Sequence, residues 1–188
     1  AAILTGGASR RMGSDKALLQ VGGVALASHV VSVARRSGAA EVVTVGGPER
    51  GLGTRHLADR YPGEGPLGGL LTALSSLESG VVLLLACDLA LLDVTTVLEI
   101  VDALGEHDVA VARTDRREPL CSAWARLRCI ATIEAAFHSG TRSLRDVLGL
   151  LDVVEVSTPA RGLLNLNEPG DLAHLAVPPT PFPGQTSN

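Results

Sequence analysis

The stretch Val81-Val82-Leu83-Leu84-Leu85-Ala86 gives the clearest strand pattern in the chain of 188 residues. No polar residue alternates with its aliphatic side chains, so we expect both faces of the strand to be buried, as in a central parallel strand. Cys87 and Asp88 follow directly. Ligands of open α/β sheets bind outside the carboxyl ends of the strands, so this position predicts a ligand site that contains Asp88. The structural alternative for Asp88 is the N-cap of a helix.

Strand and helix patterns alternate on both sides of this stretch. This order predicts an α/β fold with a mostly parallel sheet. One antiparallel pair, a hairpin or an edge addition over 108–113 and 118–125, makes the sheet mixed. In the helix expected over 94–104, the side chains predicted to face inward are Val97, Leu98, Val101 and Leu104. Further strands are expected over 1–4, 41–45, 55–58 and 152–156, and helices over 25–36, 66–78, 127–138 and from Ser143 onward.

The composition fits one domain with an aliphatic core. Hydrophobic residues make up 46% of the chain but aromatic residues only 2%, which favours parallel strands under helices. The length is that of a single domain, expected over 1–176. Residues 177–188 are rich in proline and are expected to form a disordered tail. The net charge of −4 argues against a general nucleic-acid surface.

Membrane, secretory and metal-cluster signals are weak throughout. The longest strongly apolar stretch, 81–92, is too short to span a bilayer and contains Asp88. No secretory signal is visible. The three cysteines form no C-x-x-C pair, which indicates reduced thiols and a cytoplasmic protein. The five histidines show no metal-ligand spacing.

A second informative stretch lies near the N-terminus and reads Leu4-Thr5-Gly6-Gly7-Ala8-Ser9-Arg10-Arg11-Met12-Gly13-Ser14-Asp15-Lys16. Glycines let the backbone turn sharply, and successive N–H groups in such a turn form a concavity that binds anions. Three cationic side chains add full positive charge, so the stretch suits a triphosphate. Its spacing is neither that of a P-loop nor G-x-G-x-x-G. A solvated basic loop is the alternative.

A third stretch, 59–69, contains Asp59 and then a loop that feeds a helix, with Pro66 in the first turn. The free N–H groups at such a helix start can hold an anion. An ordinary loop and helix cap explains the same pattern.

The N-terminal stretch resembles the L-x-G-G-x-S-x-R-M-G-x-D-K motif of molybdenum cofactor guanylyltransferases. Other matches are the Asp and G-P-L turn of 59–69, Cys87-Asp88, the strand Glu118-Pro119-Leu120 and the Asn-containing stretch 164–172, so the resemblance covers residues 1 to about 175. It implies a three-layer, Rossmann-like nucleotidyltransferase fold. The chain departs from the family pattern in lacking a proline after Asp88 and in carrying Gly46-Gly47 where the family often has an asparagine.

The resemblance also implies a reaction. GMP would be transferred from GTP to the phosphate of molybdenum-carrying molybdopterin, and pyrophosphate would leave. Catalytic roles fall on Lys16 and Arg11 for the phosphates and on Asp88 for Mg²⁺. The nucleotide would be bound by Leu4, Thr5, Gly6, Gly7, Lys16, Asp59 and Asp88. Implied partners are GTP and molybdopterin, with transient contact with molybdoenzymes or cofactor-insertion proteins, and no nucleic acid or membrane.

Two other functions stay open at this point. One is a nucleotidyltransferase for another acceptor, such as a cytidylyltransferase or a sugar-phosphate enzyme. Cytidylyltransferases tend to read L-A-A-G, so Leu4-Thr5-Gly6-Gly7 favours GTP. The other is a non-catalytic adaptor that binds nucleotide or cofactor. Five charged residues either contact the acceptor or are solvated surface charges: Arg116, Arg117, Glu118, Arg142 and Arg145.

Overall fold

A seven-stranded sheet forms the centre of the molecule, with strand order β5-β4-β1-β6-β8-β7-β9. The computed structural model describes residues 1–6, 16–159 and 163. The strands of the sheet are β1 (Ala2–Leu4), β4 (Val43–Val45), β5 (Arg55–Leu57), β6 (Val81–Ala86), β7 (Val109–Arg113), β8 (Arg117–Ala125) and β9 (Val153–Ser157). A separate two-stranded sheet pairs β2 (Gln20–Val21) with β3 (Val24–Ala25).

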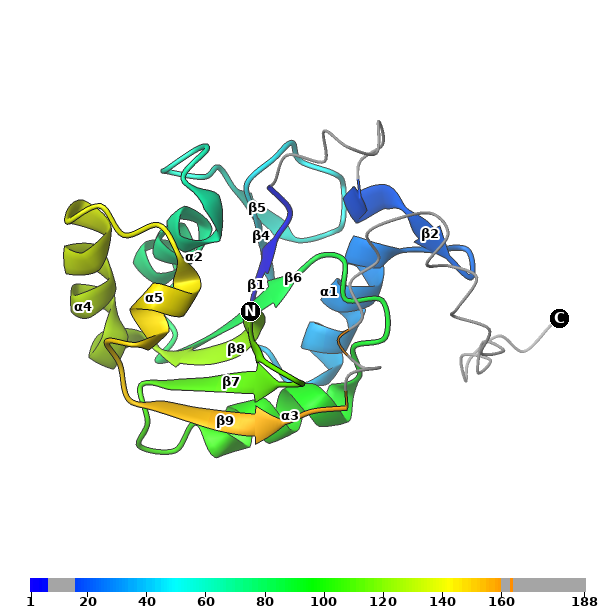
Figure 1. Ribbon diagram of the computed structural model, residues 1–188. Helices are drawn as coiled ribbons and strands as arrows, with labels where there is room; N and C mark the ends of the chain where they lie inside the picture. The colour runs from blue at the N-terminus through cyan, green and yellow to red at the C-terminus, as the bar shows by residue number, and fades with distance from the viewer. Residues whose placement is uncertain (7–15, 160–162, 164–188) are drawn as a thin grey trace, which may run out of the picture.

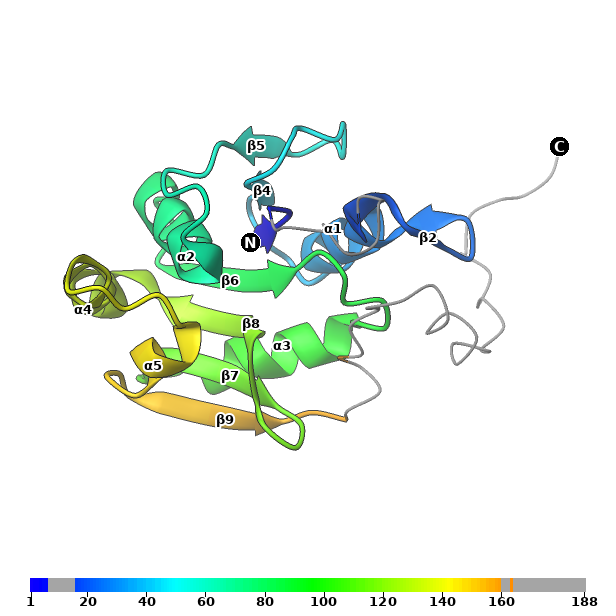
Figure 2. The ribbon, with the colours of Figure 1, turned by 45° about the horizontal axis from the view of Figure 1, so that its top comes forward.

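The helices cover both faces of the sheet, as Figures 1 and 2 show. Helices α1 and α3 share one buried cluster with side chains of β1 and β6, while α2, α4 and α5 share another on the opposite face. The three-layer α/β architecture expected from the sequence is confirmed. The helices are α1 (Leu26–Arg36), α2 (Gly65–Ser76), α3 (Val94–Ala103), α4 (Arg126–His138) and α5 (Leu144–Leu148), with the 3-10 turn η1 (Lys16–Leu18).

Strand β6 is buried on both faces, as its apolar run predicts. Val82 and Leu84 lie in the cluster beneath α2 and α4, whereas Leu83 and Leu85 lie in the cluster beneath α1 and α3. This division follows from the alternation of side chains along a strand. Burial of aliphatic side chains on both faces anchors β6, and therefore its carboxyl end, at a defined place in the sheet.

The sheet is mixed because β8 runs against its neighbours. β8 pairs antiparallel with both β6 and β7, while β1 pairs parallel with β4 and β6, and β9 parallel with β7. The hairpin expected over 108–125 is therefore present as β7 and β8. It is not an edge addition: β8 lies in the interior of the sheet, and β9 forms that edge.

The inward face of α3 differs from the one expected at one position. Leu98 is 42% exposed, whereas Ile100 is fully buried. Successive helical residues are separated by about 100°, so Leu98 points well away from the face that Val97 and Ile100 share. The prediction that Leu98 faces inward was wrong, and Ile100 takes its place in the core.

Several predicted features lie outside the described residues: Gly7, Arg11, the stretch 164–172 and the tail 177–188. The domain boundary at residue 176 therefore stays a prediction. Among the residues that the structure describes, no helix has the length and apolar character needed to cross a bilayer.

Candidate functional site

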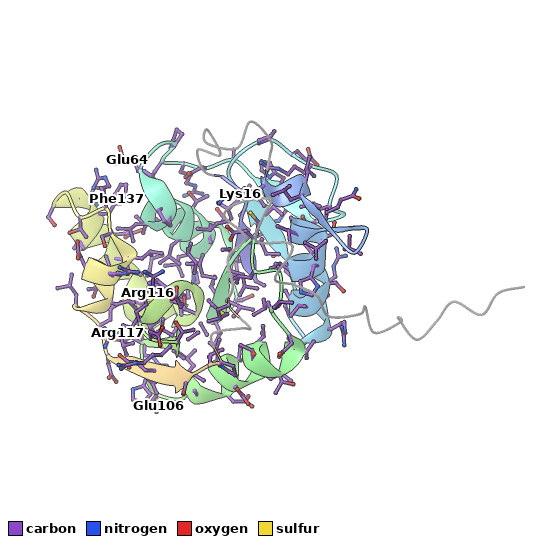
Figure 3. All side chains as sticks on the ribbon, turned by 45° about the vertical axis from the view of Figure 1, so that its right-hand side comes forward. Lys16, Glu64, Glu106, Arg116, Arg117 and Phe137 are labelled. Atoms are coloured by element: carbon purple, nitrogen blue, oxygen red, sulfur yellow. The ribbon has the colours of Figure 1, made fainter. Side chains whose placement is uncertain are left out.

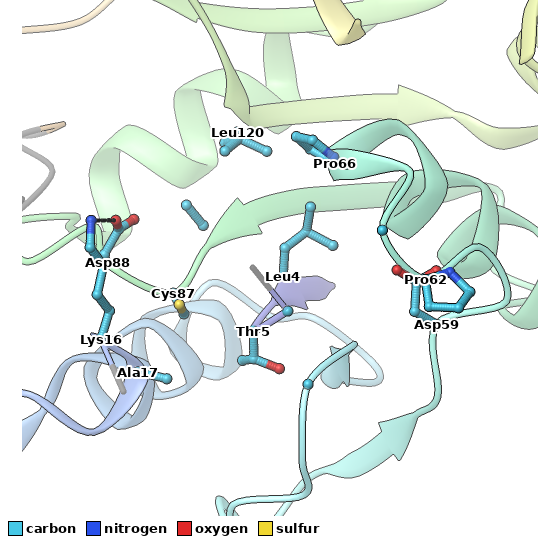
Figure 4. A pocket seen from close by; sticks show the side chains of 15 residues that line it. Leu4, Thr5, Lys16, Ala17, Asp59, Pro62, Pro66, Cys87, Asp88 and Leu120 are labelled. Carbon is cyan, nitrogen blue, oxygen red and sulfur yellow. Dashed lines mark ion pairs between the residues drawn. The ribbon is translucent and has the colours of Figure 1, made fainter. Parts of the chain in front are cut away.

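A cavity of about 600 Å³ opens at the carboxyl ends of β1 and β6 (Figure 4). From β1 the chain adds β4 and β5 on one side and then returns to place β6 on the other. Such a switch of direction leaves a crevice outside the strand ends, where α/β proteins bind ligands. The lining residues are Leu4, Thr5, Gly6, Lys16, Ala17, Gly47, Asp59, Pro62, Gly63, Gly65, Pro66, Ala86, Cys87, Asp88 and Leu120.

The structure brings together all the predicted site residues that it describes. Leu4, Thr5 and Gly6 come from the end of β1, Lys16 from η1, Asp59 from the loop before α2, and Asp88 from the turn after β6. Gly7 and Arg11 lie outside the described residues.

One wall of the cavity is formed largely by main chain. The N–H groups of Thr5 and Gly6 both donate to the carbonyl of Val45, at 2.9 and 3.1 Å. The Thr5 hydroxyl donates to the carbonyl of Gly46 at 2.8 Å. A Cβ on Gly6 would lie 3.1 Å from Gly46 Cα, so the loop after β1 rests directly on the loop after β4.

The turn after β4 is formed by two glycines, Gly46 and Gly47, and has little room for a side chain. Gly46 and Gly47 have φ values of +75° and +67°, in the region that favours glycine. A Cβ on Gly47 would lie 2.9 Å from the Arg50 guanidinium and 3.0 Å from the carbonyl oxygen of Thr5. A side chain at Gly47 would therefore crowd the wall.

Lys16 and Asp88 form the charged side of the cavity. Lys16 Nζ lies 3.9 Å from Asp88 Oδ2, and their side chains are 25% and 17% exposed. Burial raises the pKa of the Asp88 carboxyl, and the nearby Lys16 charge opposes that rise. Figure 4 shows the two side chains pointing toward each other at one end of the cavity.

Asp88 is not a helix N-cap. The N-cap of α3 is Asp93, whose Oδ1 accepts the Thr96 N–H at 2.8 Å. The turn after Asp88 is held by burial instead of by a proline, because Leu89 and Ala90 are 3% and 9% exposed.

The single carboxylate of Asp88 fits a magnesium ion that takes its other ligands from substrate phosphates and water. Mg²⁺ usually takes one or two carboxylates and completes its shell with phosphate oxygens and water. Within 1–6, 16–159 and 163, no group of three or more His, Cys, Asp or Glu side chains is placed to hold a metal by itself. Asp88 offers one carboxylate at the cavity wall, which suits such shared coordination.

Asp59 and Pro62 lie across the cavity from Lys16 and Asp88 (Figure 4). Asp59 Oδ1 accepts the Tyr61 N–H at 2.9 Å and lies 3.1 Å from the Thr72 hydroxyl. Gly65 and Pro66, at the start of α2, line the same side. The predicted helix start is therefore part of the cavity wall.

Leu120 lines the cavity next to Pro66. The family match named Leu120 within the strand Glu118-Pro119-Leu120 but assigned no site role to its side chain. Its neighbour Cys121 pairs with Leu85 across the antiparallel β6–β8 ladder. The amino-terminal part of β8 therefore lies beside the carboxyl end of β6. Only the direction of β8 in the sheet reveals this, because in a strand parallel to β6 the same residue would lie near the amino end of β6.

Two of the arginines named for the acceptor side, Arg116 and Arg117, form ion pairs with other side chains. Arg116 and Arg117 pair with Glu118 and Glu155 at 3.1 and 2.6 Å. Neither lines the cavity, and both lie apart from Lys16 in Figure 3. These contacts favour surface charges over acceptor contacts at both arginines.

Arg142 is likewise paired, beside the cavity wall: neither it nor its partner Glu64 lines the cavity, although Gly63 and Gly65 on either side of Glu64 do. Its guanidinium pairs with Glu64 and lies 4.1 Å from the centre of the Phe137 ring.

Comparison with known proteins adds the family context. The family model described as "MobA-like NTP transferase domain" matches residues 1–156. A protein of Nostoc sp. named "Probable molybdenum cofactor guanylyltransferase" is 35% identical over 92% of this chain and 88% of its own length. The molybdenum cofactor guanylyltransferase of Rhodobacter capsulatus is 32% identical over 91% of both chains. The crystal structure of molybdopterin-guanine dinucleotide biosynthesis protein A from Archaeoglobus fulgidus superposes with a TM-score of 0.72 at 25% identity, covering 92% of this chain and 94% of that one.

Proposed function

The chain belongs to the molybdenum cofactor guanylyltransferase family, and on this premise we propose that it transfers GMP from GTP to the phosphate of molybdenum-carrying molybdopterin. The products are molybdopterin guanine dinucleotide and pyrophosphate. An oxygen of the acceptor phosphate attacks the α-phosphorus of GTP. The bond from that phosphorus to the bridging oxygen breaks, and the bridging oxygen leaves with pyrophosphate.

The observation that carries the proposal is the position of the Lys16–Asp88 pair in the cavity. The pair lies at one end, and a glycine-lined main-chain wall lies beside it. A cavity of about 600 Å³ is within the usual range for small-molecule sites. The cavity therefore offers a charged end for phosphates and, beside it, a glycine-containing wall for a base and ribose.

The protein groups align the reactants and neutralise charge, and no covalent nucleophile is required. Lys16 binds phosphate oxygens and stabilises the negative charge that develops on them. Asp88 holds Mg²⁺, which supplies Lewis-acid polarisation of the phosphates when it is bound. Arg11 is proposed to hold the β- and γ-phosphates or the departing pyrophosphate, and Gly7 to bind the nucleotide.

We propose that the base and ribose lie along Leu4, Thr5 and Gly6, with Asp59 facing them. The Gly6 and Gly46 Cα atoms approach so closely that no side chain fits between the two loops. Glycine at position 6 adds no side chain to this part of the wall, which leaves space for a purine and supports GTP over a pyrimidine nucleotide. No disulfide joins Cys87, Cys121 and Cys129 in the described part of the chain, which supports a cytoplasmic site for the reaction.

The decisive experiment incubates the purified protein with molybdopterin, MgCl₂ and each of the four NTPs in turn, and identifies the dinucleotide by mass spectrometry. We expect a guanine dinucleotide with GTP. A cytosine dinucleotide formed with CTP would assign the chain to the cytidylyltransferase alternative. Tight GTP binding with no product from any NTP would favour the adaptor.

A further inference from the structure

Thr72, on the buried face of α2, connects that helix to Asp59 in the cavity wall. Its side chain is 1% exposed. The Thr72 hydroxyl oxygen accepts the Arg60 N–H at 3.1 Å and lies 3.1 Å from Asp59 Oδ1 and 2.9 Å from the carbonyl oxygen of Gly68. No other side-chain hydroxyl contacts Asp59 among the hydrogen bonds of the described residues.

The hydroxyl has one proton and two acceptors within reach. The Gly68 carbonyl is the helical i−4 partner of Thr72 and is a neutral acceptor. The Asp59 carboxylate is charged, and hydrogen bonds to ionised acceptors are the stronger ones. Asp59 Oδ1 therefore accepts hydrogen bonds from both the Thr72 hydroxyl and the Tyr61 N–H. This leaves Oδ2 without a hydrogen-bond partner among the described residues.

Close packing keeps the Asp59 loop against α2. A Cβ on Gly68 would lie 2.9 Å from Tyr61 Cβ, so the loop rests directly on the helix there. The Tyr61 ring packs against Phe137 of α4 at 4.7 Å between ring centres. With the loop backbone held by these contacts, the orientation of the Asp59 carboxyl depends on the Tyr61 N–H and the Thr72 hydroxyl.

We infer that Thr72 is a positioning residue for nucleotide recognition, which holds Asp59 so that its second oxygen accepts an N–H or O–H group of the bound guanosine. This inference rests on the proposed function. Thr72 itself does not line the cavity, so it acts through Asp59. Its effect should fall on the nucleotide and leave the pterin acceptor and the chemical step unchanged.

The test compares Thr72→Val, which keeps the shape and removes the hydroxyl, with Thr72→Ser, which keeps the hydroxyl. For Thr72→Val we expect KM for GTP to rise about tenfold, the scale of one hydrogen bond to a charged group. We expect kcat and KM for molybdopterin to stay within about twofold of wild type, and Thr72→Ser to behave as wild type. If Thr72→Val does not fold, Thr72→Ala removes the same hydroxyl without placing a methyl group there.

A double-mutant cycle separates positioning from general stability. In an Asp59→Asn background, Thr72→Val should add less than about twofold to KM for GTP. The matched control is Thr44→Val, which removes a buried hydroxyl that contacts His56 Nδ1 at 3.1 Å and does not line the cavity. It should leave KM for GTP unchanged.

Substrate analogues identify which group of guanosine donates the hydrogen bond that Asp59 accepts. If the donor is on the ribose, the Thr72→Val penalty should disappear with 2′-deoxy-GTP or 3′-deoxy-GTP. If it is the 2-amino group of the base, the penalty should disappear with ITP, which lacks that group. A penalty that persists with both deoxy analogues and with ITP assigns the donor to the base N1–H, which ITP keeps.

An unchanged KM for GTP in Thr72→Val, an equal loss for both substrates, or an additive double mutant would each overturn the inference. The proposed function is tested separately, by whether wild type forms the guanine dinucleotide. If it forms none, direct GTP-binding isotherms of the same variants test Thr72.

Discussion

Replacing Asp88 with asparagine should strongly lower activity without unfolding the protein. The substitution keeps the size of the side chain and removes its charge. Two unit charges 3.9 Å apart, the separation of Lys16 Nζ and Asp88 Oδ2, attract by about 4 kcal/mol at an effective dielectric constant of about 20. If Mg²⁺ is held equally close to Asp88 during the reaction, the asparagine variant loses an attraction of this order between the ion and the carboxylate. Since each 1.36 kcal/mol is tenfold in rate, the expected loss in kcat is about 10³-fold.

Stability should change in the other direction. Burial raises the pKa of Asp88, so the folded protein holds this proton more tightly than the unfolded chain does. The resulting stabilisation is complete below the unfolded pKa and is lost as the pH rises through the raised folded pKa. At neutral pH, the ionised carboxylate therefore makes the ligand-free protein less stable than a neutral side chain would. Asp88→Asn should leave the free energy of unfolding unchanged or increased at pH 7.

The assay pairs initial rates of dinucleotide formation with urea unfolding of the ligand-free protein between pH 4 and pH 8. We expect the stability of Asp88→Asn relative to wild type to grow from acid to neutral pH. Activity within tenfold of wild type would refute the role of Asp88 in the reaction. A mutant less stable than wild type at pH 7, or one whose relative stability falls as the pH rises, would refute the argument from burial.

Three further substitutions test the other parts of the site and its supports. Lys16→Met keeps the aliphatic stem and removes the charge, and should lower kcat about 10²- to 10³-fold, as loss of a charge-stabilising donor does in other enzymes, in the same rate assay. Gly47→Ala places a Cβ 3.0 Å from the Thr5 carbonyl at a φ of +67°, so it should cost about 1–3 kcal/mol in urea unfolding and also weaken GTP binding by calorimetry. Asp93→Ala removes the cap that accepts the Thr96 N–H and should lower the free energy of unfolding by about 1 kcal/mol with KM for GTP unchanged; a changed KM would show that the cap also shapes the cavity.

Local patterns predicted the strands and helices well because they depend on neighbours in the chain. The aliphatic run of β6 predicted burial on both faces, and both faces are buried. The same reasoning failed at Leu98, where an inward position was expected one residue after Val97. Val97 and Ile100 are three residues apart and share one face of the helix, whereas Leu98 points about 100° away from Val97, so its apolar character was misleading.

The structure also resolved choices that charge alone left open. For Arg117 the surface interpretation was already favoured, whereas Arg142 was equally consistent with acceptor binding and with solvated surface charge. Their partners Glu155 and Glu64 come from distant parts of the chain, so no local pattern could pair them. These pairs favour surface roles for both arginines.

The sequence by itself determined the α/β class, the buried strand just before Asp88 and the family motif around Lys16. Each of these depends on patterns among residues that are close together in the chain. Tertiary structure alone decided that Lys16 Nζ lies 3.9 Å from Asp88, that Leu120 enters the cavity, and that Thr72 reaches Asp59. Those contacts join segments far apart along the chain, and they depend on strand order and on how closely glycine-containing loops and helices pack. Distances of that kind are set by the three-dimensional packing of the whole core, which no stretch of sequence specifies alone.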